Sequence, residues 1–180
     1  MAEDPTERSK GLTMKPQETW RVFEERDLQA FVAHLDILFP EGSALYLEGS
    51  SIAEDIREFA ESRKPEKVAD IRPSTGPGVI LSFCPPSIRR TRLICLHMML
   101  TRTNLDGLVS LIEHHADPEV CDHLHVYNDD VMLLEGYDWG YGQLYVTGEI
   151  PEDKVRAFCQ AARCRYERSR DLVDSKPLKG

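Results

Sequence analysis

The sequence has no long apolar stretch and little positive charge. Its longest apolar run, from Leu93 to Leu100, is too short to cross a bilayer. The polar segment from Met1 to Lys10 leads us to expect no signal peptide. The 22 Lys and Arg residues are outnumbered by 31 Asp and Glu, which gives a net charge of -9. Because this charge repels phosphate backbones and anionic lipids, we expect no nucleic-acid partner and no membrane partner. The expected lack of a signal peptide predicts a cytoplasmic location.

Sequence motifs of common enzymes and cofactor sites are also missing. The five cysteines are odd in number and include no CxxC pair, which predicts reduced thiols rather than disulfides. The sequence contains no GxSxG elbow, no Walker loop and no GxGxxG fingerprint. These absences favour a non-enzymatic protein, although active sites are also assembled from residues far apart in sequence, and they predict no cofactor.

The chain length of 180 residues fits one domain with polar ends. Residues 1–17 contain two prolines and no hydrophobic periodicity, and residues 169–180 have a similar polar character. We therefore predict a flexible N-terminal arm over 1–17, a single domain over 18–168 and a flexible tail over 169–180.

Hydrophobic periodicity predicts a single α+β domain. Its sheet is expected to be mixed, with about five or six strands and about four helices packed on it. The predicted helices cover Asp27–Phe39, a segment starting near Ser51, Asn104–His115 and a segment starting at Pro151. The predicted strands cover Ala44–Glu48, Arg92–Leu100, His123–Asn128, Val131–Glu135 and Gln143–Thr147, and Val68–Ile71 and Val79–Phe83 are candidates for a further strand. Strands joined through a helix favour parallel pairing.

Histidine and cysteine residues alternate in two predicted strands. Cys95 and His97 are two residues apart, as are His123 and His125, so each pair shares one face of its strand. If the two strands are parallel neighbours, all four side chains share the face opposite the connecting helix. Imidazole and thiolate are natural ligands for zinc or another transition metal, so these four residues form a candidate metal site. The alternative is that they are ordinary polar or core residues, because no linear zinc-ligand spacing is present.

Aromatic residues and glycines are concentrated near the end of the predicted sheet. Tyr137, Trp139, Tyr141 and Tyr145 surround three glycines, and Tyr127 lies on a nearby strand. Tyr and Trp are favoured in protein interfaces, so these five residues form a candidate partner-binding surface. The alternative is a long hairpin whose aromatic side chains fold back on the core.

The turn formed by Gly49, Ser50 and Ser51 follows a strand and precedes a helix. Such a turn can present free backbone N–H groups to an anion, although helix capping alone also explains Ser51. Taken together, these patterns predict a non-enzymatic protein-interaction module that binds another protein through its aromatic-glycine loop. The alternative function is a metal-binding protein or metal-dependent hydrolase that uses the Cys/His cluster.

Overall fold

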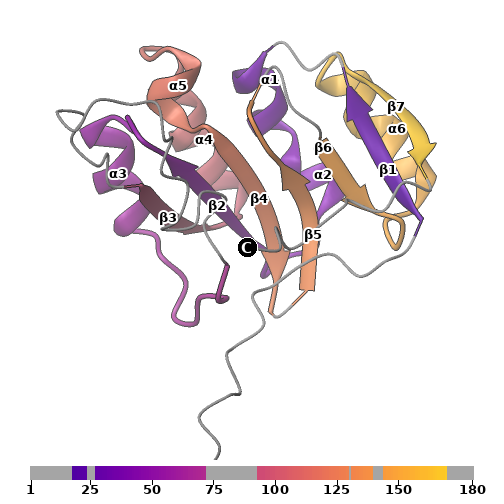
Figure 1. The fold of residues 1–180 in the computed structure, drawn as a ribbon, viewed down its shortest axis with the longest axis horizontal. Helices are drawn as coiled ribbons and strands as arrows, with labels where there is room; N and C mark the ends of the chain where they lie inside the picture. Colours follow the sequence, from indigo (N-terminus) through magenta and orange to yellow (C-terminus); the bar gives the residue numbers. More distant parts are fainter. Residues whose placement is uncertain (1–17, 24–26, 72–92, 130, 140–143, 170–180) are drawn as a thin grey trace, which may run out of the picture.

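The computed structural model describes residues 18–23, 27–71, 93–129, 131–139 and 144–169. In this part of the chain, a seven-stranded antiparallel sheet packs against helices, which confirms the α+β class (Figure 1). The strands are β1 (Thr19–Phe23), β2 (Ala44–Gly49), β3 (Ile94–Met99), β4 (His123–Asn128), β5 (Val131–Gly136), β6 (Leu144–Thr147) and β7 (Arg165–Ser169). The helices are α1 (Leu28–Ala33), α2 (Leu35–Leu38), α3 (Glu54–Glu61), α4 (Arg102–Ile112), α5 (Asp117–Val120) and α6 (Glu152–Ala161).

The strand order is β3-β2-β4-β5-β6-β1-β7, and every pairing is antiparallel. The expected parallel contact between β3 and β4 is therefore wrong. The two strands do run in the same direction, but the connection through α4 skips one position, and β2 fills it in the opposite direction. The described sheet also has one strand more than the upper number expected, because β1 and β7 were not predicted.

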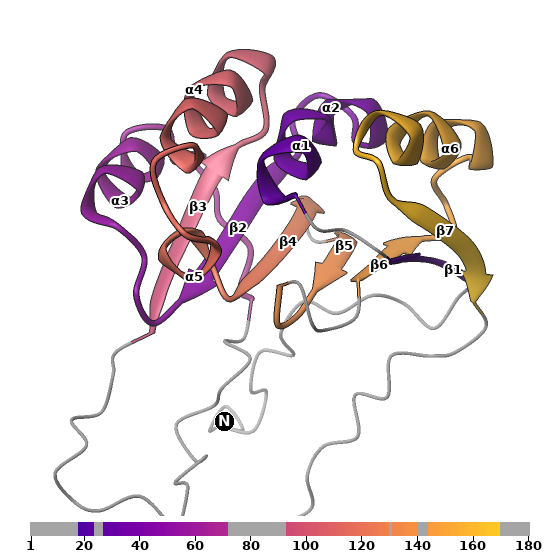
Figure 2. The same ribbon diagram turned by 90° about the horizontal axis from the view of Figure 1, so that it is seen from above.

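The longer helices α3, α4 and α6 lie on one face of the sheet together with α1 and α2, as Figure 2 shows. The main apolar core fills the space between these helices and the sheet. Strand residues such as Leu45, Leu47, Leu124 and Val126 supply its floor, and each is almost completely buried. Burial of this apolar layer is the main contribution to the stability of the domain.

Local sequence explains where several helices begin. Asp27 accepts a hydrogen bond from the backbone N–H of Ala30 at 2.9 Å and so caps the start of α1. Thr101 caps α4 in the same way, through the N–H of Asn104. The predicted helix over Asp27–Phe39 is divided into α1 and α2, because His34 leaves helical geometry with φ of -116° and ψ of 8°.

Two other predicted elements differ from the structure or lie outside it. Val68–Ile71 contains no strand, and the segment at Val79–Phe83 lies outside the described residues. The helix expected near Ser51 begins three residues later, at Glu54. None of the described helices is both long and apolar enough to cross a membrane.

Candidate functional site

The face of the sheet opposite the helices, here called the polar face, carries a row of ionisable side chains. Cross-strand register places one such residue from each strand in this row. In order across the sheet, the row consists of His97, Tyr46, His125, Glu135, Tyr145, Arg21 and Glu167. A shorter row beside it contains Cys95, Glu48 and His123. The same strands that present apolar residues to the helices therefore present ionisable residues to the polar face.

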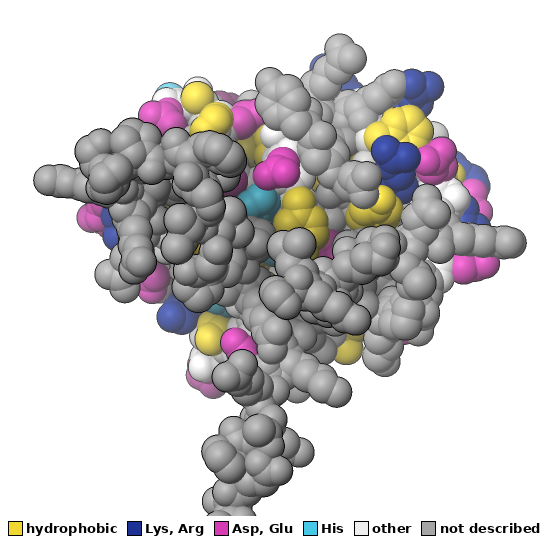
Figure 3. Space-filling view, viewed as in Figure 1, with side chains coloured by type: hydrophobic (Ala, Val, Ile, Leu, Met, Phe, Trp, Pro, Cys, Tyr) yellow, Lys and Arg dark blue, Asp and Glu magenta, His cyan; other side chains and the backbone are white. Residues whose placement is uncertain are grey.

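Six aromatic rings on the polar face form a continuous series of contacts, here called the Tyr-His chain. Successive ring centroids are separated by 5.7, 5.0, 5.5, 5.0 and 5.6 Å. Tyrosine and histidine alternate along the chain in the order Tyr127, His97, Tyr46, His125, Tyr137 and His123. Figure 3 views this side of the molecule, where histidine, acidic and apolar side chains lie next to one another. Edge-to-face and stacked contacts of this kind hold rings in fixed orientations.

His125 lies in the middle of the Tyr-His chain and is only 2% exposed. Its ring stacks on Tyr46 and meets the Tyr137 ring edge to face. The Nδ1 atom of His125 is buried and has no hydrogen-bond partner among the residues that the structure describes. Burial, with a smaller contribution from the charge of His123, lowers the pKa of His125 to about 3, so the ring is neutral near pH 7.

His123 is held in one tautomer by the backbone that follows β5. Its Nδ1 accepts a hydrogen bond from the N–H of Asp138 at 2.9 Å, so the proton of the neutral ring is on Nε2. This Nε2 faces Glu48, whose Oε1 atom is 3.9 Å away. Glu48 is completely buried and its Oε2 accepts a hydrogen bond from the Tyr46 hydroxyl at 2.7 Å. Glu48, which lies beside His123 in the shorter row, therefore joins this row to the longer one through its hydrogen bond with Tyr46.

The Tyr46 hydroxyl remains protonated because burial, and then its hydrogen bonds with Cys95 and Glu48, raise its pKa. Burial also raises the pKa of the Cys95 thiol, although this residue is exposed overall. The thiol is therefore not prepared to act as a thiolate nucleophile.

The other end of the Tyr-His chain is formed by His97 of the edge strand β3 and Tyr127 of β4. Nδ1 of His97 is 2.9 Å from the Tyr127 hydroxyl, and the two form a hydrogen bond. Burial lowers the pKa of His97 to about 4, with a further contribution from Lys64. His97 is half-buried, whereas Tyr127 is buried, so the chain is more accessible at β3 than at its centre.

The four predicted metal ligands share the polar face, but the structure separates them into two groups. Because β2 lies between β3 and β4, the backbones that carry the two groups are roughly 9.5 Å apart. Glu48 lies between Cys95 and His123, and Tyr46 separates the other pair, His97 and His125. Across the described residues, no three His, Cys, Asp or Glu side chains are arranged to hold a metal ion.

The residues of the predicted aromatic surface are distributed over both faces of the sheet. Tyr127 and Tyr145 are buried on the polar face, and Tyr137 is half-buried there. Trp139 packs against Phe31 of α1, with ring centroids 4.8 Å apart, and so belongs to the helix side. Tyr141 lies outside the described residues.

The predicted anion site lies next to acidic groups. The backbone N–H of Ser50 already donates to the Asp122 carboxylate at 3.0 Å. Gly49 is buried, Ser51 is exposed, and the first turn of α3 contains Glu54 and Asp55. These carboxylates oppose an additional anion at this turn.

Tyr46, Glu48 and Glu135 were not among the predicted site residues. A sequence signal was present for two of them, because Tyr46 and Glu48 alternate with apolar residues in the strand predicted at Ala44–Glu48. This alternation shows that the strand has a polar face opposite its apolar face. It does not show that β2 lies between the two histidine-bearing strands.

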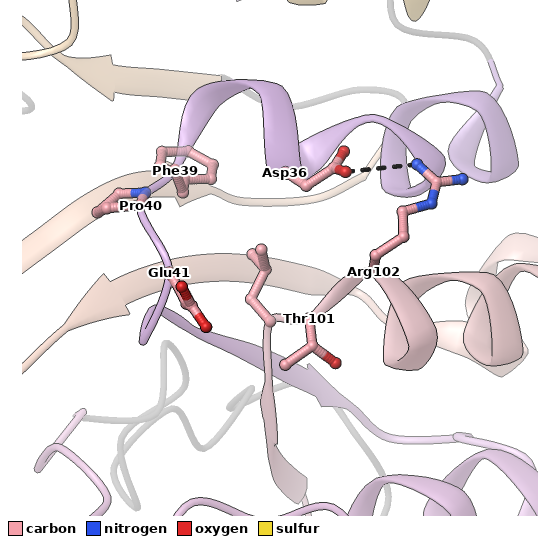
Figure 4. Close-up of a pocket in the computed structure, with 7 residues that line it drawn as sticks. Asp36, Phe39, Pro40, Glu41, Thr101 and Arg102 are labelled. Atoms are coloured by element: carbon pink, nitrogen blue, oxygen red, sulfur yellow. Dashed lines mark hydrogen bonds and ion pairs between the residues drawn. The ribbon is translucent and has the colours of Figure 1, made fainter.

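A surface pocket of about 240 Å³ lies between α2, the turn before β2 and the start of α4 (Figure 4). Its walls include Phe39, Glu41 and Thr101. Arg102, the cation of this pocket, already binds Asp36 at 3.4 Å and Asp106 at 2.6 Å. The positive charge of this pocket is therefore already neutralised by acidic side chains.

No protein-family model, curated protein or solved structure matches this chain.

Proposed function

We propose that the protein is a non-enzymatic binding protein that holds a small organic ligand against the Tyr-His chain. The observation that carries this proposal is His125, a buried histidine with an unpartnered Nδ1 between two tyrosine rings. A buried polar atom without a partner destabilises a fold, and such groups are concentrated at functional sites. A ligand that hydrogen-bonds with this nitrogen would remove the penalty.

Binding is favoured over catalysis by the protonation states of the site. His97 and His125 are neutral near pH 7, and both resist protonation because their pKa values are lowered. The Cys95 thiol and the Tyr46 hydroxyl keep their protons. Such groups offer hydrogen-bond donors, acceptors and ring faces, but they are poor acids or nucleophiles at this pH.

The test is a ligand screen in which the histidines report where a compound binds. Small amines, carboxylates, nucleosides and sugars would be added to the full chain, and the side-chain ¹⁵N signals of histidine would be followed by NMR. We expect a true ligand to shift the signals of His97, His123 and His125. The signals of His34 and His114, which lie outside the polar face, are the internal control. If no compound shifts the polar-face signals selectively, the proposal is wrong.

Interaction with another protein through the aromatic-glycine segment is a second proposal. It is favoured by Tyr137, which is half-buried at the margin of the polar face, next to Asp138 with a side chain 75% exposed. Replacement of Tyr137 by Ala should then abolish capture of one specific partner. Trp139→Ala is unsuitable for this test, because it removes a core contact with Phe31. If the Tyr137→Ala variant still captures every protein that the wild type captures, this second function is contradicted.

A further inference from the structure

The two edges of the described sheet differ in charge. β3 forms one edge and β7 forms the other (Figure 1). The strand β7 has the sequence RYERS, in which three of five residues are charged, whereas β3 has the sequence ICLHMM without Lys, Arg, Asp or Glu. Charged side chains protect an edge strand from pairing with another chain. By this measure, β7 is protected and β3 is not.

Part of β3 directs its backbone groups away from the rest of the sheet. The N–H of Leu100 donates to the Ser43 carbonyl at 2.8 Å, and hydrogen-bonded positions alternate along an antiparallel pair. The even-numbered residues of β3 therefore bond to β2, and the N–H and C=O groups of Cys95 and His97 point outwards. No strand among the described residues pairs with β3 on that side, and the Cys95 side chain is exposed.

The end of this edge is closed by contacts of Met99. Its outward N–H donates to the Arg63 carbonyl at 3.0 Å, and its carbonyl accepts a hydrogen bond from the Asn104 side chain at 2.8 Å. Strand pairing beyond His97 is therefore blocked. The open edge is a short segment of backbone in which Cys95 and His97 are the available positions.

We propose that β3 pairs antiparallel with β3 of a second copy of this chain, so that the two sheets become continuous in a two-fold symmetric dimer. Cys95 of each copy would lie opposite His97 of the other, and each such pair would exchange two hydrogen bonds. This register uses the outward groups of β3 that Met99 leaves open. The inference does not depend on the ligand-binding function proposed above.

The charges of α3 favour a second copy as the occupant of this edge. α3 packs on β3, and it starts with Glu54 and Asp55 in its first turn. Arg63 and Lys64 follow its last turn, beside the Met99 end of β3. Antiparallel pairing of two β3 strands places both α3 helices on the same face of the joined sheet and in opposite directions. The acidic start of each helix then faces toward the basic end of the other, which is favourable both for the side chains and for the helix dipoles.

The difference between the two edges also predicts where assembly stops. A two-fold contact uses the same strand of both copies, so one dimer consumes both β3 edges. The outer edges of the joined sheet are then the two β7 strands, whose charges discourage further pairing. A closed dimer is therefore expected rather than a fibre.

The first experiment measures the mass of the full chain in solution. Sedimentation velocity would be recorded from about 1 µM to about 200 µM, a range suited to a dissociation constant near the micromolar level. We expect a reversible equilibrium between monomer and dimer, without larger species.

Two lysine variants then locate the interface. Cys95→Lys places an ammonium group from each copy at diagonal positions about 7 to 8 Å apart across the paired strands. It should raise the dissociation constant of the dimer at least about tenfold. Val131→Lys makes the same change in net charge at an exposed residue of β5 and should leave the constant unchanged. Circular dichroism would check that both variants fold.

Cross-linking with a short bismaleimide is a second test that does not need a disruptive variant. The thiols of the two Cys95 residues would lie within its reach across the dimer, whereas Cys121, Cys159 and Cys164 are buried. Cys84 lies outside the described residues, so the reaction would use Cys84→Ser protein. We expect a covalent dimer, and its loss when Cys95→Ser is added.

Each result supports or overturns the dimer through β3. Loss of the dimer in Cys95→Lys alone, together with cross-linking that requires Cys95, would support it. A wild type that stays monomeric at about 200 µM would overturn it. A dimer that both lysine variants keep, or that both weaken equally, would place the interface elsewhere and also overturn it. If Cys95→Lys does not fold, the cross-linking decides, and the lack of a covalent dimer that depends on Cys95 would overturn the proposal.

Discussion

Replacement of His125 by Phe should remove a large part of the acid sensitivity of this protein. The ring is packed against Tyr46 of β2 and Tyr137, it lies opposite Glu135 of β5, and His123 shares its strand. Burial in this surrounding lowers its pKa to about 3 from the ordinary value of 6.5. Between these two values, the unfolded chain binds a proton at His125 and the folded protein does not. The free energy of unfolding therefore falls as the pH is lowered.

The size of the effect follows from the pKa difference. A histidine that titrates at 6.5 when unfolded and at about 3 when folded contributes a loss of about 2 kcal/mol between about pH 7 and pH 5. The variant lacks this contribution. At pH 7, Phe should also raise the free energy of unfolding by about 1 kcal/mol, because the unpartnered Nδ1 is removed from the interior.

Urea unfolding at several pH values, followed by tryptophan fluorescence, measures both effects. His125→Gln is the matched control, because it removes the titration but keeps a polar group in the interior. We expect both variants to lose less stability than the wild type on acidification, and only the Phe variant to gain stability at pH 7. Other groups, including His97, titrate in all three proteins and cancel in the differences. If the wild type and both variants lose stability in parallel, His125 is reached by protons in the folded state and the reasoning is wrong.

Three further predictions concern backbone geometry and an ion pair outside the polar face. Arg163 has φ of 56° just after α6, so Arg163→Gly should stabilise the protein by about 0.5 to 1 kcal/mol in urea unfolding, whereas Arg163→Ala should give no such gain. A Cβ atom at Gly148 would clash with the Glu18 carbonyl oxygen, so Gly148→Ala should destabilise by about 2 kcal/mol or more, and an unchanged stability would refute this contact. Asp55 raises the pKa of His115, so this pair stabilises the fold below pH 6.5 and loses its effect as the pH rises through the folded pKa. His115→Gln should therefore lower the melting temperature more at pH 5 than at pH 8, and an equal effect at both would contradict it.

Elements with a clear apolar pattern could be predicted from the sequence. The strands that became β2, β4, β5 and β6 and the helix that became α4 all carry such patterns. β7 could not be predicted in this way. It is an edge strand with the sequence RYERS, and Tyr166 is its only aromatic residue, so it has no apolar alternation. Charged residues on an edge strand discourage pairing with another sheet, but they also hide the strand from a search for alternating apolar residues.

The candidate site could be predicted only in part. Alternation along single strands places Cys95 with His97 and His123 with His125, and the structure has all four on the polar face. Their neighbours depend on strand order, which local sequence does not encode. The insertion of β2 between β3 and β4 brought Tyr46 and Glu48 into the centre, and it turned an expected Cys/His cluster into the Tyr-His chain.

The two faces of the same strands provide an internal comparison of stability and function. On the helix side, β2 and β4 present Leu45, Leu47, Leu124 and Val126, so these strands readily form a stable apolar layer. On the polar face they present two histidines, a glutamate and two tyrosines that are buried almost as completely. Buried ionisable groups stabilise a fold less than apolar groups of the same size, and natural proteins retain such conflicts mainly at functional sites. A His125→Phe variant that is more stable but no longer binds a compound identified by the ligand screen would therefore show that the polar face is maintained for its ligand. A variant that gains stability and keeps full affinity would show that this histidine is not needed for binding.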